Sequence, residues 1–182
     1  MQEAVDSEWE CFTRAQCGDE MAWRVLIARH QTRLAALALF VTGSAEATDD
    51  VVQETFVRAL RARISRNTGT VRGFLGTIAY RLAVKEAMRL RRNVGLDGRN
   101  VAESGRDALD RVLTEERDRL VADAITTLDA EHRDVLILRF YGGHSYEEIA
   151  ETLGIPLGTV KSRIFHAVKS CRGTLKEKGV LR

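Results

Sequence analysis

The sequence predicts an all-α protein built from two small helical domains. Proline, which breaks helices, occurs once in 182 residues, and aromatic residues make up only 6% of the chain. Apolar residues recur at helical spacing through most of the sequence. This periodicity is lost between residues 94 and 107, where three glycines occur. We therefore expect helical domains at 1–93 and 108–182, joined by a flexible linker at 94–107.

Hydrophobic spacing predicts helices through most of the N-terminal domain. A long apolar stripe predicts a helix over 19–41, and the sequence Thr-Gly-Ser at 42–44 predicts its end. The next expected helix, 49–64, has acidic residues near its start and arginines near its end, which complements the helix dipole. Residues 66–72 are expected to form a loop, and 74–92 a further helix.

The last of these helices carries a basic stripe, Arg81, Lys85, Arg89 and Arg92. Their spacing of i, i+4, i+8 and i+11 places them on one face. At 1.5 Å per residue the stripe is about 16 Å long, enough to follow roughly five nucleotides of one strand. Like charges at this spacing repel, so the stripe adds no stability to the helix. The alternative is a solvated face whose arginine stems cover apolar surface.

The C-terminal domain is expected to begin with a helix over 109–127. Asp129 is positioned to cap the next helix, which should end at the glycine pair 142–143. Ser145 and Glu148 have the spacing of a capping box, which predicts another helix start. Gly154 is then expected to end that helix in the left-handed region.

Residues 145–172 have the pattern of a helix-turn-helix, whose second helix begins near Pro156. Apolar Val160, Ile164 and Val168 are expected to face inward, which leaves the basic residues for other faces. From 156 to 182 there are seven Lys or Arg and one acid, Glu177, in a chain of net charge +2. This local excess of positive charge favours nucleic acid as a ligand. A plain helical hairpin with a solvated basic face is the alternative.

Other classes of protein are disfavoured. The longest apolar run, 34–41, is too short to span a bilayer, and the acidic N-terminal residues are unlike a signal peptide. Cys11, Cys17 and Cys171 form neither a metal-type pair of pairs nor an even disulfide set. We find no acid–base pair, nucleophile arrangement or metal cluster in the sequence. We therefore expect a cytoplasmic protein without a membrane span, catalytic site, metal or cofactor.

Five motifs together resemble the sigma-70 family of RNA polymerase sigma factors, in its small extracytoplasmic-function (ECF, group 4) subfamily. In the C-terminal half, LDAEHR at 128–133, YEEIA at 146–150 and GTVKSR at 158–163 resemble region 4 almost residue for residue. In the N-terminal half, DDVVQETF at 49–56 resembles the acidic-Gln-Glu-Thr-Phe core of region 2. FLGTIA at 74–79 resembles its Trp-Leu-x-x-Ile-Ala stretch.

The resemblance implies a factor that binds core RNA polymerase, through the β′ clamp helices and the β flap, and directs it to promoter DNA. The residues expected to dock on the clamp helices are Asp49, Asp50, Gln53, Glu54 and Phe56. Those expected to engage the −10 element are Arg66, Asn67, Arg72, Phe74, Tyr80, Arg81, Lys85, Arg89 and Arg92. Those expected to contact the −35 element are Thr159, Lys161, Ser162, Arg163, His166 and Lys169. An anti-sigma factor is a further partner that the resemblance implies.

Within these sets, Arg163 is the candidate for bidentate reading of guanine, and Lys161 and Lys169 are expected to bind phosphate. Arg81, Phe74 and Lys85 depart from residues frequent in the family, which leaves the −10 preference open. Two other functions compete with the sigma factor. One is a sigma-like decoy that titrates an anti-sigma factor, and the other is a helix-turn-helix repressor that dimerises through its N-terminal half.

Overall fold

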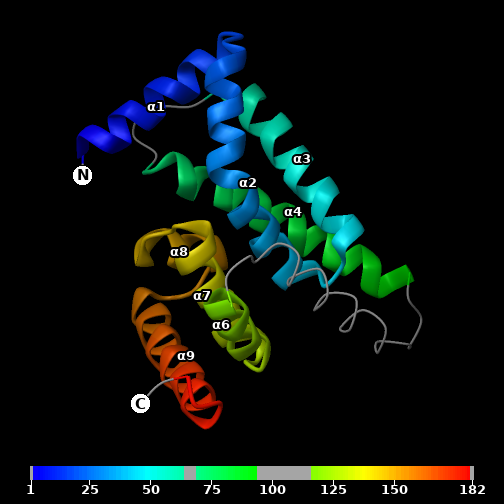
Figure 1. Cartoon of the computed structure of the whole chain (residues 1–182), viewed down its shortest axis with the longest axis vertical. Helices are drawn as coiled ribbons and strands as arrows, with labels where there is room; N and C mark the ends of the chain where they lie inside the picture. The colour runs from blue at the N-terminus through cyan, green and yellow to red at the C-terminus, as the bar shows by residue number, and fades with distance from the viewer. Residues whose placement is uncertain (1, 64–68, 94–115, 181–182) are drawn as a thin grey trace.

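The computed structural model describes residues 2–63, 69–93 and 116–180, and within these ranges the regular structure is entirely helical (Figure 1). The expectation of an all-α fold is confirmed. Helices α1 to α4 form an N-terminal unit: α1 (Gln2–Gln16), α2 (Glu20–Thr42), α3 (Ala45–Arg61) and α4 (Val71–Asn93). A C-terminal unit contains α6 (Glu116–Thr126), α7 (Ala130–Leu136), the π-helical turn η1 (Ile137–Gly142), α8 (Tyr146–Leu153) and α9 (Leu157–Glu177). The expected linker at 94–107 lies outside the described residues.

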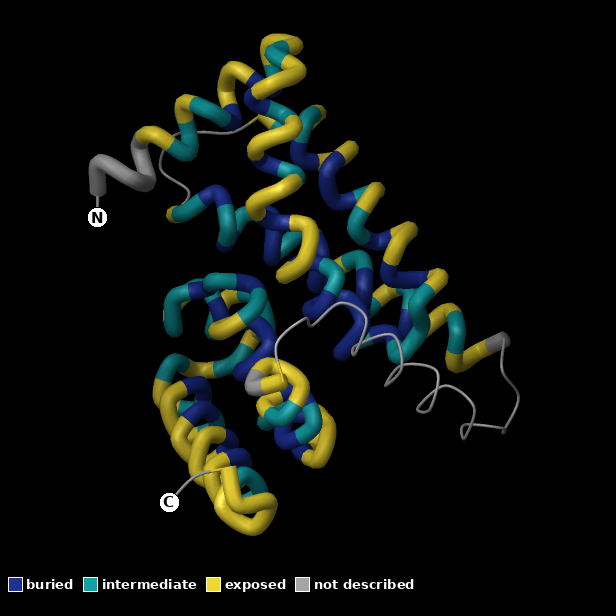
Figure 2. The backbone as a smooth tube through the Cα atoms, in the orientation of Figure 1, coloured by how far each residue is buried: buried dark blue, intermediate teal, exposed yellow. Residues whose placement is uncertain are grey.

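Helix α2 is the central element of the N-terminal unit and packs against α1, α3 and α4. Near its C-terminal end the helix is buried on all sides, with every residue from 36 to 40 in the core (Figure 2). Asp19 caps its start by accepting a hydrogen bond from the backbone N–H of Ala22 at 3.0 Å. Gly43, at φ 67°, ends it in the left-handed conformation, which costs glycine little.

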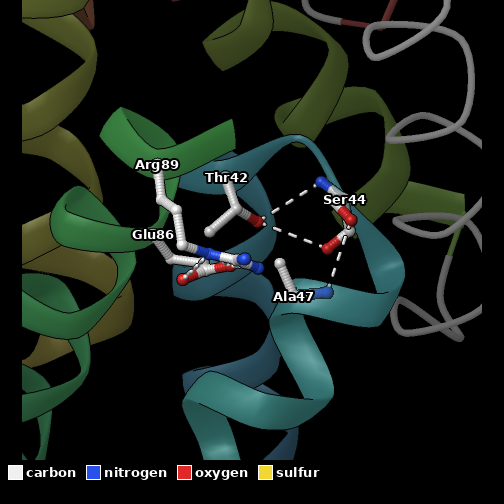
Figure 3. Close-up of polar contacts among 5 residues, drawn as sticks. All are labelled: Thr42, Ser44, Ala47, Glu86 and Arg89. Atoms are coloured by element: carbon white, nitrogen blue, oxygen red, sulfur yellow. Dashed lines mark hydrogen bonds and ion pairs between the residues drawn. The ribbon is translucent and has the colours of Figure 1, made fainter. Parts of the chain in front are cut away.

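Helix α3 begins four residues earlier than the sequence pattern predicts, because of the corner between α2 and α3 (Figure 3). The Ser44 side chain accepts a hydrogen bond from the N–H of Ala47 at 3.3 Å, which makes Ser44 the N-cap. The Thr42 hydroxyl in turn accepts from the N–H of Ser44 at 3.3 Å. This corner lies beside the Glu86–Arg89 pair of α4 (Figure 3).

The C-terminal unit confirms the predicted caps. Asp129 accepts from the N–H of His132 at 3.0 Å, and Ser145 and Glu148 form both bonds of the capping box. Gly143 and Gly154 are both left-handed, at φ 76° and 65°. The first helix is described only from Glu116, since residues 109–115 of its predicted span lie outside the described ranges.

The inward face of α9 differs from the prediction at Val168. That side chain is 39% exposed, whereas Val160, Ile164, Ala167 and Cys171 are buried. Eight residues along an α-helix rotate by about 80° beyond two full turns. Repeated i+4 steps therefore drift off the apolar face, and the i+7 and i+11 positions remain on it.

The two helical units pack against each other. Segment η1 lies on both α2 and α4, and the Phe40 and Tyr141 rings meet across the boundary with centroids 5.1 Å apart. Residues 135–138 are buried in this region, and they join the same hydrophobic core as Leu37 and Leu75. None of the helices in the described ranges is long and apolar enough to cross a membrane.

Candidate nucleic-acid and protein interfaces

Helix α9 presents a basic face with an aromatic side chain in its middle. Of the six predicted −35 contacts, Lys161, Ser162, His166 and Lys169 are exposed, and Thr159 and Arg163 are half-buried. Phe165 is 65% exposed and lies one helical turn from each of the two lysines. Sequence reasoning missed Phe165, although its i−4 and i+4 lysines were a usable signal.

Arg163 points toward α7, away from this face. Its Nη2 lies 2.5 Å from Glu131 Oε2, and its side chain is 22% exposed. The ion pair joins α9 to the start of α7. Reading guanine, the role predicted for Arg163, would require this pair to break.

The basic stripe of α4 is exposed along its whole length at Arg81, Lys85, Arg89 and Arg92. Arg89 is paired with an acid, since its Nε lies 2.9 Å from Glu86 Oε1 (Figure 3). Arg92 Nε donates to the Met88 carbonyl at 3.3 Å and keeps its full charge. This hydrogen bond lowers the pKa of Glu86, so the pair stays ionised and its charges cancel. The stripe is consequently more positive at its other three positions.

The beginning of α4 holds −10 candidates that are already engaged within the protein. Phe74 packs against Trp9 and Phe12, with centroids 6.0 and 5.9 Å away. Tyr80 is 7% exposed and donates a hydrogen bond to Asp134 at 3.0 Å. Burial, together with this carboxylate, raises the pKa of Tyr80 well above its usual range. These two residues are therefore packing residues in this conformation.

The Arg72 side chain is half-buried and donates a hydrogen bond to the Phe140 carbonyl. The two remaining −10 candidates, Arg66 and Asn67, lie outside the described residues.

The outer face of α3 carries the predicted polymerase-docking residues, with one correction. Asp49, Asp50 and Gln53 are exposed, and Glu54 is paired with Arg58 at 2.6 Å. Phe56 was predicted to be a docking residue, but it is only 6% exposed. Its ring meets Trp23 edge-on at 5.4 Å, so it belongs to the core.

Val57, adjacent to Phe56, is 38% exposed and shares the outer face of α3, one turn after Gln53. It is the apolar residue that the sequence analysis missed on this face. Among the described residues, no three His, Cys, Asp or Glu side chains gather in a way that could hold a metal ion.

Comparison with known proteins identifies both units. Residues 26–93 match the family model for Sigma-70 region 2, and residues 118–171 match that for Sigma-70, region 4. The ECF RNA polymerase sigma factor SigL of Mycobacterium tuberculosis is 37% identical over 178 residues, covering 92% of this chain and 97% of that protein. The chain belongs to the ECF family of RNA polymerase sigma factors. It is a promoter-directing transcription factor and not an enzyme.

A second relative of this sigma factor is the ECF RNA polymerase sigma-E factor of Escherichia coli K12. It is 33% identical over 172 residues, covering 85% of this chain and 86% of that protein. We use "region 2" below for α1–α4 and "region 4" for α6–α9.

Solved structures with the same fold include complexes with other proteins. CnrH in complex with the cytosolic domain of CnrY gives a TM-score of 0.61 at 28% identity, covering 92% of this chain and 96% of CnrH. RpoE bound to the anti-sigma factor NepR, from Bartonella quintana, gives 0.57 at 24% identity, covering 84% and 96%. At that identity the second likeness concerns the fold alone.

The sigma factor also has an apolar groove between its two regions, with a volume of about 560 Å³. Its walls come from α2, α6, the end of α7, η1 and α9. Three exposed apolar side chains line it, namely Val121, Phe140 and Val168. The charged residues around it are Arg29, Arg33, Arg172 and a single acid, Asp118.

Proposed function

We propose that this sigma factor binds core RNA polymerase in the cytoplasm and reads the −10 element with region 2 and the −35 element with region 4. The observation that carries the proposal is the pair of separate exposed basic faces, on α4 and on α9. Each face lies within the match to its own sigma region. A repressor that used its N-terminal half to dimerise would have no need of the α4 face.

For the −35 element, we place α9 in the major groove of duplex DNA. Lys161 and Lys169 contact phosphates on either side, which orients the helix without reading sequence. Ser162 and His166 are exposed and reach base edges, and Phe165 contacts a thymine methyl group. Thr159 supports the start of the helix, and Arg163 holds α9 on α7 through Glu131.

For the −10 element, the exposed stripe follows the backbone of one DNA strand. Arg81, Lys85 and Arg92 supply the positive charge, with a smaller share from Arg89 because Glu86 neutralises it. Positive charge along a groove is the usual means of holding single-stranded nucleic acid. We propose that Arg66, Asn67, Arg72, Phe74 and Tyr80 contact the melted bases. Arg72 and Tyr80 become available once region 4 is displaced, because their partners are the Phe140 carbonyl and Asp134. Phe74 must instead turn away from Trp9 and Phe12 of region 2.

For polymerase binding, we propose the outer face of α3 as the surface that meets the β′ clamp helices. Asp49, Asp50, Gln53 and Glu54 form its polar part, and Val57 lies among them as the apolar contact. This combination resembles a small interface core with a polar rim. Region 4 supplies the second attachment, to the β flap.

Run-off transcription of the host's genomic DNA tests the proposal. Core RNA polymerase alone and core polymerase with the purified sigma factor are compared, and the new transcript starts are sequenced. We expect new starts that share one upstream hexamer-like element near −35 and another near −10. The decoy and the repressor both predict no added initiation. The absence of new starts would therefore reject the proposal that the faces of α4 and α9 read promoter elements.

We also propose an anti-sigma factor as a partner and the apolar groove as its docking surface. Exposed Val121 and Phe140 offer an apolar strip, and Arg29, Arg33 and Arg172 place positive charge beside it. An amphipathic helix with acidic flanks has the matching chemistry. Two proteins with this fold are solved in complexes, RpoE with the anti-sigma factor NepR and CnrH with the cytosolic domain of CnrY. A purified inhibitor of this sigma factor should lose potency at least tenfold against Val121→Asp, roughly 1.4 kcal/mol, while that variant still initiates transcription.

A further inference from the structure

We propose that the free sigma factor closes on itself, with region 4 docked on the first half of α4 so that −10 DNA is excluded. This rests on the proposed role of α4 in −10 binding. In the closed state, η1 and the turn after it lie directly on α4. Opening, and not only recruitment, is then required before the promoter can be engaged.

The contact at the centre of this interface is between two glycines. A Cβ atom added to Gly76 of α4 would lie 2.6 Å from the carbonyl oxygen of Gly142 and 2.8 Å from its Cα. It would also lie 2.9 Å from Cε1 of His144. The three nearest obstacles all belong to region 4. Closure in this geometry therefore requires a residue without a side chain at position 76.

Polar groups buried in the same interface find partners across it. His144 is fully buried, and its Nε2 lies 2.9 Å from the Thr77 hydroxyl of α4. Its Nδ1 lies 3.1 Å from the Leu138 carbonyl, on its own side. Tyr80 donates to Asp134 across the boundary at 3.0 Å. Buried polar groups need such partners, so they favour this one docking geometry over non-specific collapse.

Closure also occupies groups that −10 DNA would need. Arg72 is turned toward region 4, where it donates to the Phe140 carbonyl. The space around Gly143 is filled by this side chain, since an added Cβ would come 2.5 Å from Arg72 Cδ. Glu148 of α8 lies against Gly73, with its Oε1 3.4 Å from the position of an added Cβ. A carboxylate at the start of α4 repels a DNA phosphate, so closure opposes DNA binding there.

The excluded surface is limited. Arg81, Lys85 and Arg92 remain exposed in the closed state, as does the basic face of α9. The closed sigma factor therefore retains a general attraction for DNA, but region 4 covers the first half of α4. A protein that is competent only when open binds its ligand with an affinity reduced by the open fraction.

The test uses the full-length free chain, labelled with a dye pair at Arg61→Cys of α3 and Lys176→Cys of α9, with the native cysteines replaced by alanine. Energy transfer reports the separation of the two regions in the absence of polymerase. Gly76→Ala is compared with Gly173→Ala, an alanine in a helix with open space around it. We expect high transfer for the unsubstituted chain and for Gly173→Ala, and a clear loss for Gly76→Ala.

A second measurement is the affinity of the same free proteins for a single-stranded −10 oligonucleotide taken from a mapped promoter. If nine-tenths of the free chain is closed, opening raises the affinity roughly tenfold, and Gly76→Ala should show this gain. The proposal is overturned if the unsubstituted chain already shows low energy transfer, or if Gly76→Ala opens the chain without any gain in affinity.

Circular dichroism establishes whether Gly76→Ala folds. If it does not fold, the energy transfer of the unsubstituted chain alone tests whether the free sigma factor is closed. If the unsubstituted chain fails to initiate transcription with core polymerase, the proposed function is wrong. The distance measurement on the free chain does not depend on that result.

Discussion

Arg163 and Phe165 lie two positions apart on α9 and therefore on different sides of it. The guanidinium of Arg163 is engaged by Glu131, whereas the ring of Phe165 projects among Lys161 and Lys169. A charged group held in an ion pair must lose that partner before it can bind a base, and this loss offsets the gain. An exposed aromatic ring has no such cost. At the residue scale, we therefore propose Phe165 for the sequence-specific contact and Arg163 for the orientation of α9.

Replacement of Phe165 by alanine should relax discrimination at one −35 base pair by about 1 kcal/mol, because a thymine methyl contact is lost. Arg163→Ala should instead weaken binding by a similar amount on every −35 sequence, since α9 is less well held. Competition binding of holoenzyme to promoters with single −35 substitutions measures both. A loss confined to one guanine for Arg163→Ala would restore that residue as the base reader.

Two neighbouring residues of α3 should separate folding from polymerase binding. Phe56→Ala removes a buried ring that packs on Trp23, and we expect it to lower the free energy of unfolding by about 3–5 kcal/mol. Val57→Asp should leave unfolding nearly unchanged and weaken binding to core polymerase at least tenfold, roughly 1.4 kcal/mol. Urea denaturation and titration with labelled core polymerase provide the two readings. Normal polymerase binding by Val57→Asp would move the interface off this face.

At the scale of the elements, two sides of α4 contribute to two different surfaces of the molecule. One side, containing Gly76, Thr77 and Tyr80, meets region 4, and the adjacent side carries the exposed basic stripe. Both sides follow from the rotation of 100° per residue, which separates residues 77 and 81 by only about 40°. Movement of region 4 therefore changes what lies beside the stripe without altering the helix itself.

The four charges of the stripe should contribute unequally to DNA binding. Lys85→Ala and Arg92→Ala should each reduce the slope of log affinity against log salt by about 0.7 for single-stranded DNA. Arg89→Ala should have less effect, since Glu86 already neutralises Arg89. The measurement is a salt titration of the −10 oligonucleotide bound to the Gly76→Ala chain. Equal slopes for all three variants would show that the Glu86–Arg89 pair opens on DNA.

For the whole molecule, the interface between regions 2 and 4 links closure to protonation. Burial lowers the pKa of His144, and the neighbouring Arg72 of α4 acts in the same direction. Glu148 of α8 and the Leu138 carbonyl oppose this shift, and Arg139 donates to the His144 carbonyl at 2.7 Å. In the open chain the imidazole would regain its ordinary pKa near 6.5. The open state then binds a proton at a higher pH than the closed state.

Closure should therefore weaken as the pH falls. The contribution of His144 is fully present above about pH 6.5 and is lost as the pH falls toward the lowered value. Burial raises the pKa of Asp134, which favours closure in more acidic solution, so the relevant range lies between about pH 7.5 and 5.5. Energy transfer in the labelled chain should decrease over this range, and His144→Gln should abolish the change. A constant signal in the unsubstituted chain would contradict the assignment.

The sequence alone determined the helical class, the family and the ends of several helices. Ser145 with Glu148, and Gly154 after them, act through backbone groups only a few residues away, so local pattern was sufficient. The tertiary structure decided which sides of those helices are available. Phe56 is covered by Trp23 from another helix, and Tyr80 by region 4. Such burial depends on elements distant in the chain, and periodicity within one helix carries no information about which neighbour will cover which face.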